Sequence, residues 1–295
     1  MLPQNPKMFD WRFGLIIAFS TILRFWHFGS IPPIQAQTYL SFRFVSSIYN
    51  IGCAVLLYYI CKKIFKVEKI ALLSSFIFAV LPWTIEQGRI YSQPSNVLFW
   101  LLLILFLNIV WKNIIIHVVS IICIPFLFYL LYPHFWILKS GLSMISINSL
   151  VKNIFTLLSP DFWFFKNDTF WWGGIRDSGI INLAFLPFLL IGLFQTNIPA
   201  RARIFTILLL ITLVSAASPF YPESREFFLV TPTLAMLISF GIYSSFNFLT
   251  KNIYKFVILV FLFLFIYDFS CLLHLYSVHY QQQISGNLSQ IHEPF

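Results

Sequence analysis

Long apolar runs dominate this chain, and short polar segments separate them. Many of these runs approach or reach the roughly 20 residues that cross a hydrocarbon core as an α-helix. The runs are continuous and do not alternate with polar residues as the strands of a membrane barrel would. We therefore predict an all-α polytopic membrane protein with nine spans. Their predicted ranges are 11–29, 42–65, 69–88, 95–111, 113–132, 181–196, 203–219, 227–249 and 254–276.

The composition agrees with this pattern. Only 10% of the 295 residues are charged and 59% are hydrophobic, whereas soluble domains carry about 25% charged residues. The formal net charge of +9 would suggest nucleic acid as the partner of a soluble protein. In a membrane chain it indicates basic loops held on the cytoplasmic side. No linker divides the chain, so we treat 1–295 as one membrane domain without a nucleic-acid partner.

Lysine and arginine set the predicted orientation. With the N-terminus in the cytoplasm, 11 of the 19 Lys and Arg residues lie on cytoplasmic segments, and every short cytoplasmic turn is basic. The 133–180 loop and the polar tail 277–295 are then extracytoplasmic. Within the loop, 136–158 has the spacing of a helix that lies along the membrane interface. The following stretch, 159–168, combines acidic and aromatic residues, and we expect it to cover the outer mouth of the bundle.

On this topology, charged residues gather at the outer end of the spans. They are Arg43, Glu86, Arg89, Asp161, Lys166, Asp168, Glu223, Arg225 and Glu226. Arginine binds phosphate as a bidentate fork, and the apolar helices can hold a hydrocarbon tail. The pattern therefore favours a lipid-linked phosphate as ligand.

Structural explanations of the same residues stay open. Glu86 and Arg89 are three residues apart on one helix face and can pair with each other. Arg24 and Arg43 can extend to the lipid headgroups. Asp268 is an acid inside the last predicted span, where a charged group costs roughly 3 kcal/mol, and it is either functional or reached by water at the outer end.

Several blocks of the sequence resemble the bacterial GT-C membrane glycosyltransferases, which are related to protein O-mannosyltransferases and to the sugar transferases of lipid A and lipopolysaccharide core. The blocks run in the same order along most of 20–245. They are Leu23-Arg24-Phe25-Trp26-His27-Phe28-Gly29, Ser41-Phe42-Arg43-Phe44, Gln87-Gly88-Arg89, Ser159-Pro160-Asp161-Phe162-Trp163, Leu186-Pro187-Phe188-Leu189-Leu190, and Ser224-Arg225-Glu226.

The resemblance implies an enzyme of a bacterial inner (plasma) membrane that moves a sugar from a polyprenyl-phosphate carrier to an extracytoplasmic lipid or glycan acceptor. In such enzymes an acid acts as general base on the acceptor hydroxyl, and arginines stabilise the leaving phosphate. Arg89 and Arg225 match that second role, and Arg43 joins them as a phosphate-binding candidate. The sequence establishes no cofactor or metal ligand, and a divalent metal stays open.

The chain departs from the family pattern in its first outer loop. That loop carries an acidic motif in the family, whereas 29–40 contains no acid. The candidate replacements are Asp161, Glu86 and Asp168. The alternative is a non-catalytic scaffold that binds the lipid phosphate without turnover. A transporter is a third hypothesis, although internal repeats and mid-membrane polar residues are sparse.

Overall fold

The computed structural model describes residues 10–26, 37–90, 93–111, 147–165, 178–195, 208–213, 215–216, 227–248 and 251–279. All regular structure in these ranges is helical, which confirms the all-α prediction for that part of the chain.

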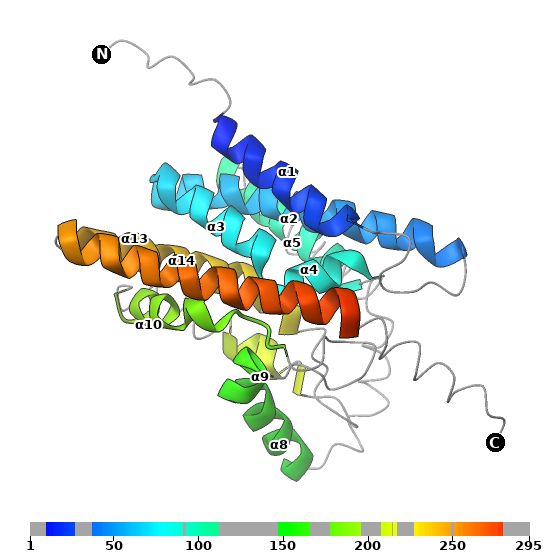
Figure 1. The fold of residues 1–295 in the computed structure, drawn as a ribbon. Helices are drawn as coiled ribbons and strands as arrows, with labels where there is room; N and C mark the ends of the chain where they lie inside the picture. Colours follow the sequence, from blue (N-terminus) through cyan, green and yellow to red (C-terminus); the bar gives the residue numbers. More distant parts are fainter. Residues whose placement is uncertain are drawn as a thin grey trace.

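Figure 1 shows the helices as an elongated bundle, with α8 and α9 on one side of it. The elements are α1 (Trp11–Phe25), α2 (Gln37–Phe65), α3 (Glu68–Val80), α4 (Pro82–Arg89), α5 (Gln93–Val110), α8 (Ile147–Leu158), α9 (Pro160–Phe164), η2 (Leu183–Phe185), α10 (Leu186–Gln195), η3 (Phe228–Val230), α13 (Thr231–Phe248), α14 (Lys251–His274) and a π-helical turn η4 (Leu275–His279).

Three described helical stretches are long and apolar enough to cross a bilayer: Arg43–Phe65, Phe228–Phe246 and Lys255–His279. The bent pair α3–α4 makes a fourth if it counts as one span. The described chain therefore contains three to four candidate membrane spans and not nine. Helix α10 has ten residues, or about 15 Å of rise, which is half of a hydrocarbon core. The predicted span 113–132 lies outside the described residues, and 203–219 is described only at 208–213 and 215–216, which are helical.

The prediction that 69–88 forms one continuous helix is wrong. The helix breaks at Leu81, where α3 and α4 meet at a bend of 60°. Leu81 has the extended ψ of 134°, and Pro82 occupies the first turn of α4. Proline disfavours the helical conformation of the residue before it and offers no backbone N–H to continue the helix. The break turns the short α4 inward, and all eight of its residues are buried.

Close backbone contacts hold the centre of the bundle. Helix α2 packs on α3, α4 and α5, α13 packs on α3, and α10 packs on α13. The α10–α13 contact depends on two glycines, because a Cβ at Gly192 would lie 2.0 Å from the Leu237 carbonyl oxygen and one at Gly241 would lie 1.8 Å from that of Phe188. Small residues at such crossings are the usual means by which membrane helices approach each other.

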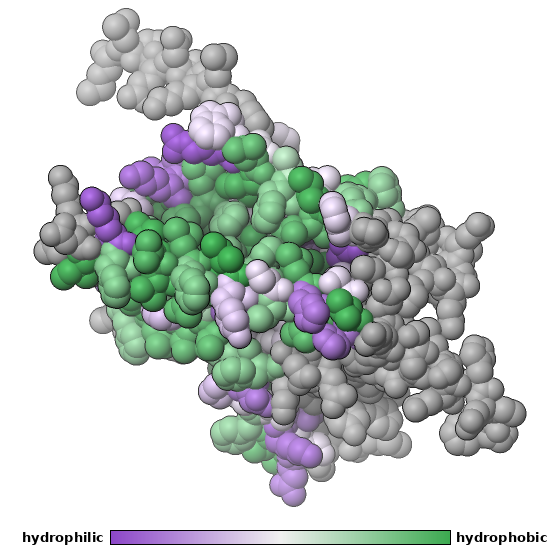
Figure 2. All heavy atoms as spheres, viewed as in Figure 1, coloured by the Kyte–Doolittle hydropathy of each residue, from purple (hydrophilic) through white to green (hydrophobic). Residues whose placement is uncertain are grey.

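Helix α14 lies on the outside of the bundle. Three phenylalanines spaced four residues apart, Phe261, Phe265 and Phe269, contact rings of α10, η2, α3 and α1. The other faces of α14 are largely exposed, and their side chains are mostly apolar. Figure 2 shows apolar residues over much of the described surface on this side. The exposed apolar faces match a helix that faces lipid.

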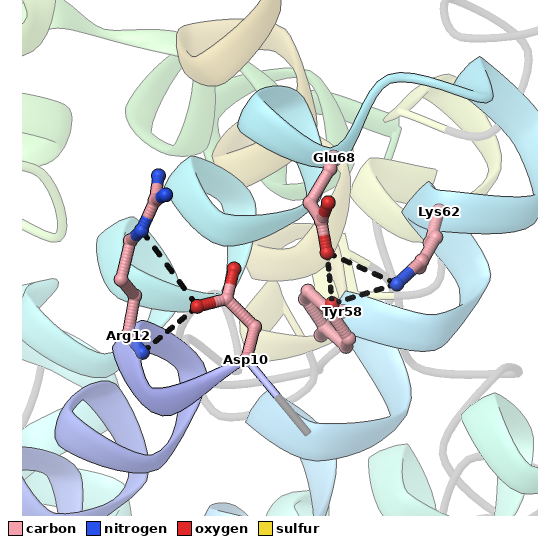
Figure 3. Close-up of polar contacts among 5 residues, drawn as sticks. All are labelled: Asp10, Arg12, Tyr58, Lys62 and Glu68. Carbon is pink, nitrogen blue, oxygen red and sulfur yellow. Dashed lines mark hydrogen bonds and ion pairs between the residues drawn. The ribbon is translucent and has the colours of Figure 1, made fainter. Parts of the chain in front are cut away.

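The turn between α2 and α3 lies at one end of the bundle, and the turn with the adjoining helix ends carries the four lysines from which we predict a cytoplasmic position. Lys62 Nζ lies 3.1 Å from Glu68 Oε1 and donates to the Tyr58 hydroxyl, which in turn donates to Glu68 (Figure 3). In the same view Asp10 caps α1 by accepting from the Arg12 backbone N–H at 3.0 Å. These contacts fix the helix ends on this side.

The predicted interfacial helix is described from Ile147 onward, as α8. Its buried side carries Asn153 and Leu157, while Ile147, Val151 and Phe155 are exposed. The parts of the predicted outer loop at 133–146 and 166–177, and the tail 280–295, lie outside the described residues.

Candidate functional site

Four charged side chains are buried in the described part of the chain: Arg24, Arg43, Glu86 and Arg89. They lie where α1, α2 and α4 meet, at the end of the bundle opposite the lysine turn. Three of the four were predicted site residues, and the fold brings Arg43, Glu86 and Arg89 together. Arg24 was expected only as a headgroup contact. We refer to these four residues as the arginine cluster.

Helix α4 organises the arginine cluster through its C-terminal end. The Arg43 Nε donates to the Arg89 carbonyl oxygen at 2.7 Å, and the Ser47 hydroxyl donates to the Gly88 carbonyl oxygen at 2.6 Å. The last carbonyls of a helix have no partner within the helix, and a cation there also complements the helix dipole. Arg43 therefore closes α4 from α2 and does not extend to the headgroups as one alternative predicted.

Arg89 joins three elements. Its Nη1 donates to the Leu23 carbonyl oxygen at 2.8 Å, its Nη2 donates to that of Trp26, and its Nε donates to the Tyr276 hydroxyl at 3.0 Å. Leu23 and Trp26 end α1, and Tyr276 lies in η4. Only 3% of Arg89 is exposed, so these oxygen acceptors replace water around its charge without cancelling it.

Arg24 lies deeper in the same cluster and is fully buried. Its Nε donates to Asn50 Oδ1 at 2.8 Å, and its Nη1 donates to the Ser20 hydroxyl at 2.8 Å. Gly88 leaves room for it, because a Cβ there would lie 3.0 Å from the Arg24 Nε. The expectation that Arg24 reaches the headgroups is wrong. An arginine within an apolar run is itself a signal of a buried polar site, and that signal could have found it.

The other predicted acids lie elsewhere. Asp161 is exposed in α9, although its neighbour Phe162 packs edge-on against Trp83 of α4, with ring centroids 6.1 Å apart. The stretch that was expected to cover the outer mouth therefore contacts α4 one turn before Glu86. Asp168 and Arg225 lie outside the described residues.

Asp268 has a structural partner. The Ala184 backbone N–H donates to its Oδ2 at 2.8 Å. Ala184 lies in the first turn of the η2–α10 helix, where backbone N–H groups have no partner within the helix. Asp268 of α14 therefore accepts a first-turn N–H of this helix, whereas the side chain of its own N-cap residue, Asn182, makes no capping hydrogen bond.

Among the buried side chains that the structure describes, the arginine cluster has three positive groups and one carboxylate. Burying an excess of positive charge is costly, so the cluster favours an anionic ligand. Among the described residues, no three His, Cys, Asp or Glu side chains lie together as a metal site would require.

Neither family models, nor curated proteins, nor solved structures match this chain.

Proposed function

We propose that this chain is a GT-C-like integral membrane glycosyltransferase that takes a sugar from a polyprenyl-phosphate donor and transfers it to an extracytoplasmic lipid or glycan acceptor. In this proposal the chain has nine spans in a bacterial inner membrane, with the N-terminus in the cytoplasm; span 69–88 is bent at Leu81, and span 181–196 contains the short helix α10. The arginine cluster then faces outward, and the lysine turn between α2 and α3 faces the cytoplasm.

The excess of positive charge in the arginine cluster carries the proposal. Arg43 and Arg89 come together at the end of α4, and Arg24 adds a third charge beside them. A phosphate at this end would balance the charge excess and accept charge-assisted hydrogen bonds, which are about twice as strong as neutral ones. The same groups would stabilise the phosphate as it leaves the sugar. Arg225 would join them from outside the described residues.

Glu86 is the preferred general base, because it lies on the same face of α4 as Arg89. It would remove the proton of the acceptor hydroxyl as the glycosidic bond forms and the carrier phosphate departs. Asp161 and Asp168, in the stretch that packs over Trp83 and its continuation, are the alternative bases.

The test uses the full chain in lipid nanodiscs with a radiolabelled polyprenyl-phosphate sugar and a lipid extract as acceptor. We expect label to move to the acceptor, to be lost in Glu86→Gln, and to be retained in Lys62→Gln at the opposite end. Donor binding should weaken in Arg43→Gln. Absence of both transfer and donor binding in the parent chain would overturn the proposal.

A second function, binding of the lipid phosphate without turnover, is favoured by one observation. Glu86 is fully buried, whereas a general base must reach the acceptor hydroxyl at about 3 Å. The same assay separates the two: donor binding that depends on Arg43, without transfer by the parent chain, assigns the binding function and rejects the enzyme.

A further inference from the structure

A second feature lies far from the arginine cluster. An apolar cavity of about 450 Å³ separates α10 from the first half of α14. Its walls are formed mainly by Pro187, Phe188, Ile191, Val257, Val260 and Leu264. Tyr276, which contacts Arg89, lies twelve residues beyond Leu264, or about 18 Å along the helix.

The cavity lies beside a ring contact that joins α14 to α10. Phe261 is the first residue of the phenylalanine row, and it contacts Phe188 at 4.9 Å between ring centroids. Because Gly192 and Gly241 hold α10 tightly against α13, α10 cannot shift toward α14 to close the cavity.

The lining offers little to a polar ligand. Its polar residues are Gln195 and Ser245, and the Ser245 hydroxyl already donates to the Gly241 carbonyl oxygen at 2.7 Å. An apolar cavity excludes water, and an empty one forfeits dispersion contacts on every wall. Hydrocarbon is therefore the ligand that would gain the most free energy by entering the cavity.

The cavity is continuous with the lipid-facing surface of a candidate span. Leu259 and Phe263 of α14 flank its lining residues and are 67% and 71% exposed, and Figure 2 shows apolar residues over this side of the molecule. At that depth the surrounding solvent is the acyl chains of the bilayer.

We propose that this cavity is a binding site for one acyl chain of a bilayer phospholipid, which fills the space between α10 and α14. The acyl chain would make dispersion contacts with the walls that α10 and α14 contribute to the cavity. The site is separate from the arginine cluster and does not depend on the proposed sugar transfer.

The test reconstitutes the full chain in phosphatidylcholine vesicles in which one acyl chain carries a diazirine. After irradiation, labelled residues are identified by mass spectrometry. We expect stronger labelling at Phe188, Ile191 and Val257 than at the outward-facing Leu259 and Phe263. Excess polyprenyl phosphate should leave the pattern unchanged.

Two variants fill the cavity from opposite walls, Val257→Phe and Ile191→Phe, and Leu259→Phe is the matched control on the lipid side. Each filling variant should reduce labelling of the opposite wall about tenfold through loss of buried methylene contacts, and the control should not. Uniform labelling along α14, or equal effects of the three variants, would overturn the proposal. Displacement of the label by polyprenyl phosphate would instead assign the cavity to the donor.

Discussion

Arg89 and Tyr276 are 187 residues apart in the sequence, yet they contact each other twice. The Arg89 Nε donates to the Tyr276 hydroxyl at 3.0 Å, and its guanidinium lies 5.0 Å from the centre of the tyrosine ring. This contact joins the end of the last described helix to α4 and, through the carbonyls that Arg89 also binds, to α1. The outer helix and the arginine cluster therefore form one structural unit.

Tyr276→Phe removes the hydroxyl and keeps the ring over the guanidinium. We expect it to lower the free energy of unfolding by about 1 kcal/mol, the usual contribution of one hydrogen bond. Equilibrium unfolding of the detergent-solubilised chain by sodium dodecyl sulfate measures this. The matched control is Tyr267→Phe on the same helix, where the tyrosine is 62% exposed and the change should be within about 0.5 kcal/mol. Equal effects of the two substitutions would contradict the role of the contact.

Gly241→Ala tests the crossing of α10 and α13. The added Cβ would lie 1.8 Å from the Phe188 carbonyl oxygen, and the obstacle is backbone that cannot rotate away. We expect a loss of about 3 kcal/mol, at the upper end for overpacked sites. Ser245→Ala, one turn along α13, is the control, because its hydroxyl bonds only within its own helix. A stability similar to the parent for Gly241→Ala would show that the two backbones are not in contact.

Lys66→Gly should stabilise the turn between α2 and α3. Lys66 has a φ of 56°, a left-handed conformation that costs a side-chain-bearing residue roughly 1 kcal/mol and glycine almost nothing. We expect a gain of about 0.5 kcal/mol, since glycine also loses more entropy on folding. Lys63→Gly, inside the last turn of α2, should instead destabilise by about 1 kcal/mol. Equilibrium unfolding measures both changes, and opposite signs for Lys66→Gly and Lys63→Gly would confirm that the left-handed backbone of Lys66 costs free energy.

Local sequence signals predicted the local features of this fold. The uninterrupted apolar runs identified α2, α13 and α14, because helix length and hydrophobicity are readable within one segment. The break at Leu81 could also have been read from Pro82 alone. The charge spacing of Glu86 and Arg89 placed them correctly on one helix face.

The contacts between distant segments could not be read in the same way. Asp268 caps η2 across 84 residues, and Tyr276 binds Arg89 across 187, and no periodicity links either pair. Arg24 lies in an apolar run, which signals a buried polar site, but a long side chain near a span end can also extend to the headgroups, so the sequence does not name its partner. Asn50 on α2 accepts from the Arg24 Nε and so holds this side chain inside the bundle. Nothing in the sequence indicates that these two residues are partners.

Gly88→Ala tests whether the arginine cluster is as closely packed as its hydrogen bonds imply. The new Cβ would lie 3.0 Å from the Arg24 Nε and 3.1 Å from Asn50 Cγ. Arg24 cannot easily retreat, because its Nη1 is held by Ser20. We expect a loss of about 2 kcal/mol in unfolding free energy, as for other overpacked sites.

A double-mutant cycle with Asn50→Ala separates this packing effect from a change in helix propensity. Asn50→Ala alone removes the acceptor of the Arg24 Nε, at 2.8 Å, and should destabilise by about 2 kcal/mol because a buried cation loses its partner. In the Gly88→Ala background the same substitution also relieves one of the two close contacts. The double variant should therefore be less destabilised than the sum of the single variants, with a coupling of about 1 kcal/mol. Strict additivity would mean that Gly88 does not limit the position of Arg24, and the arginine cluster would then have room that the contacts of Arg24 and Asn50 do not show.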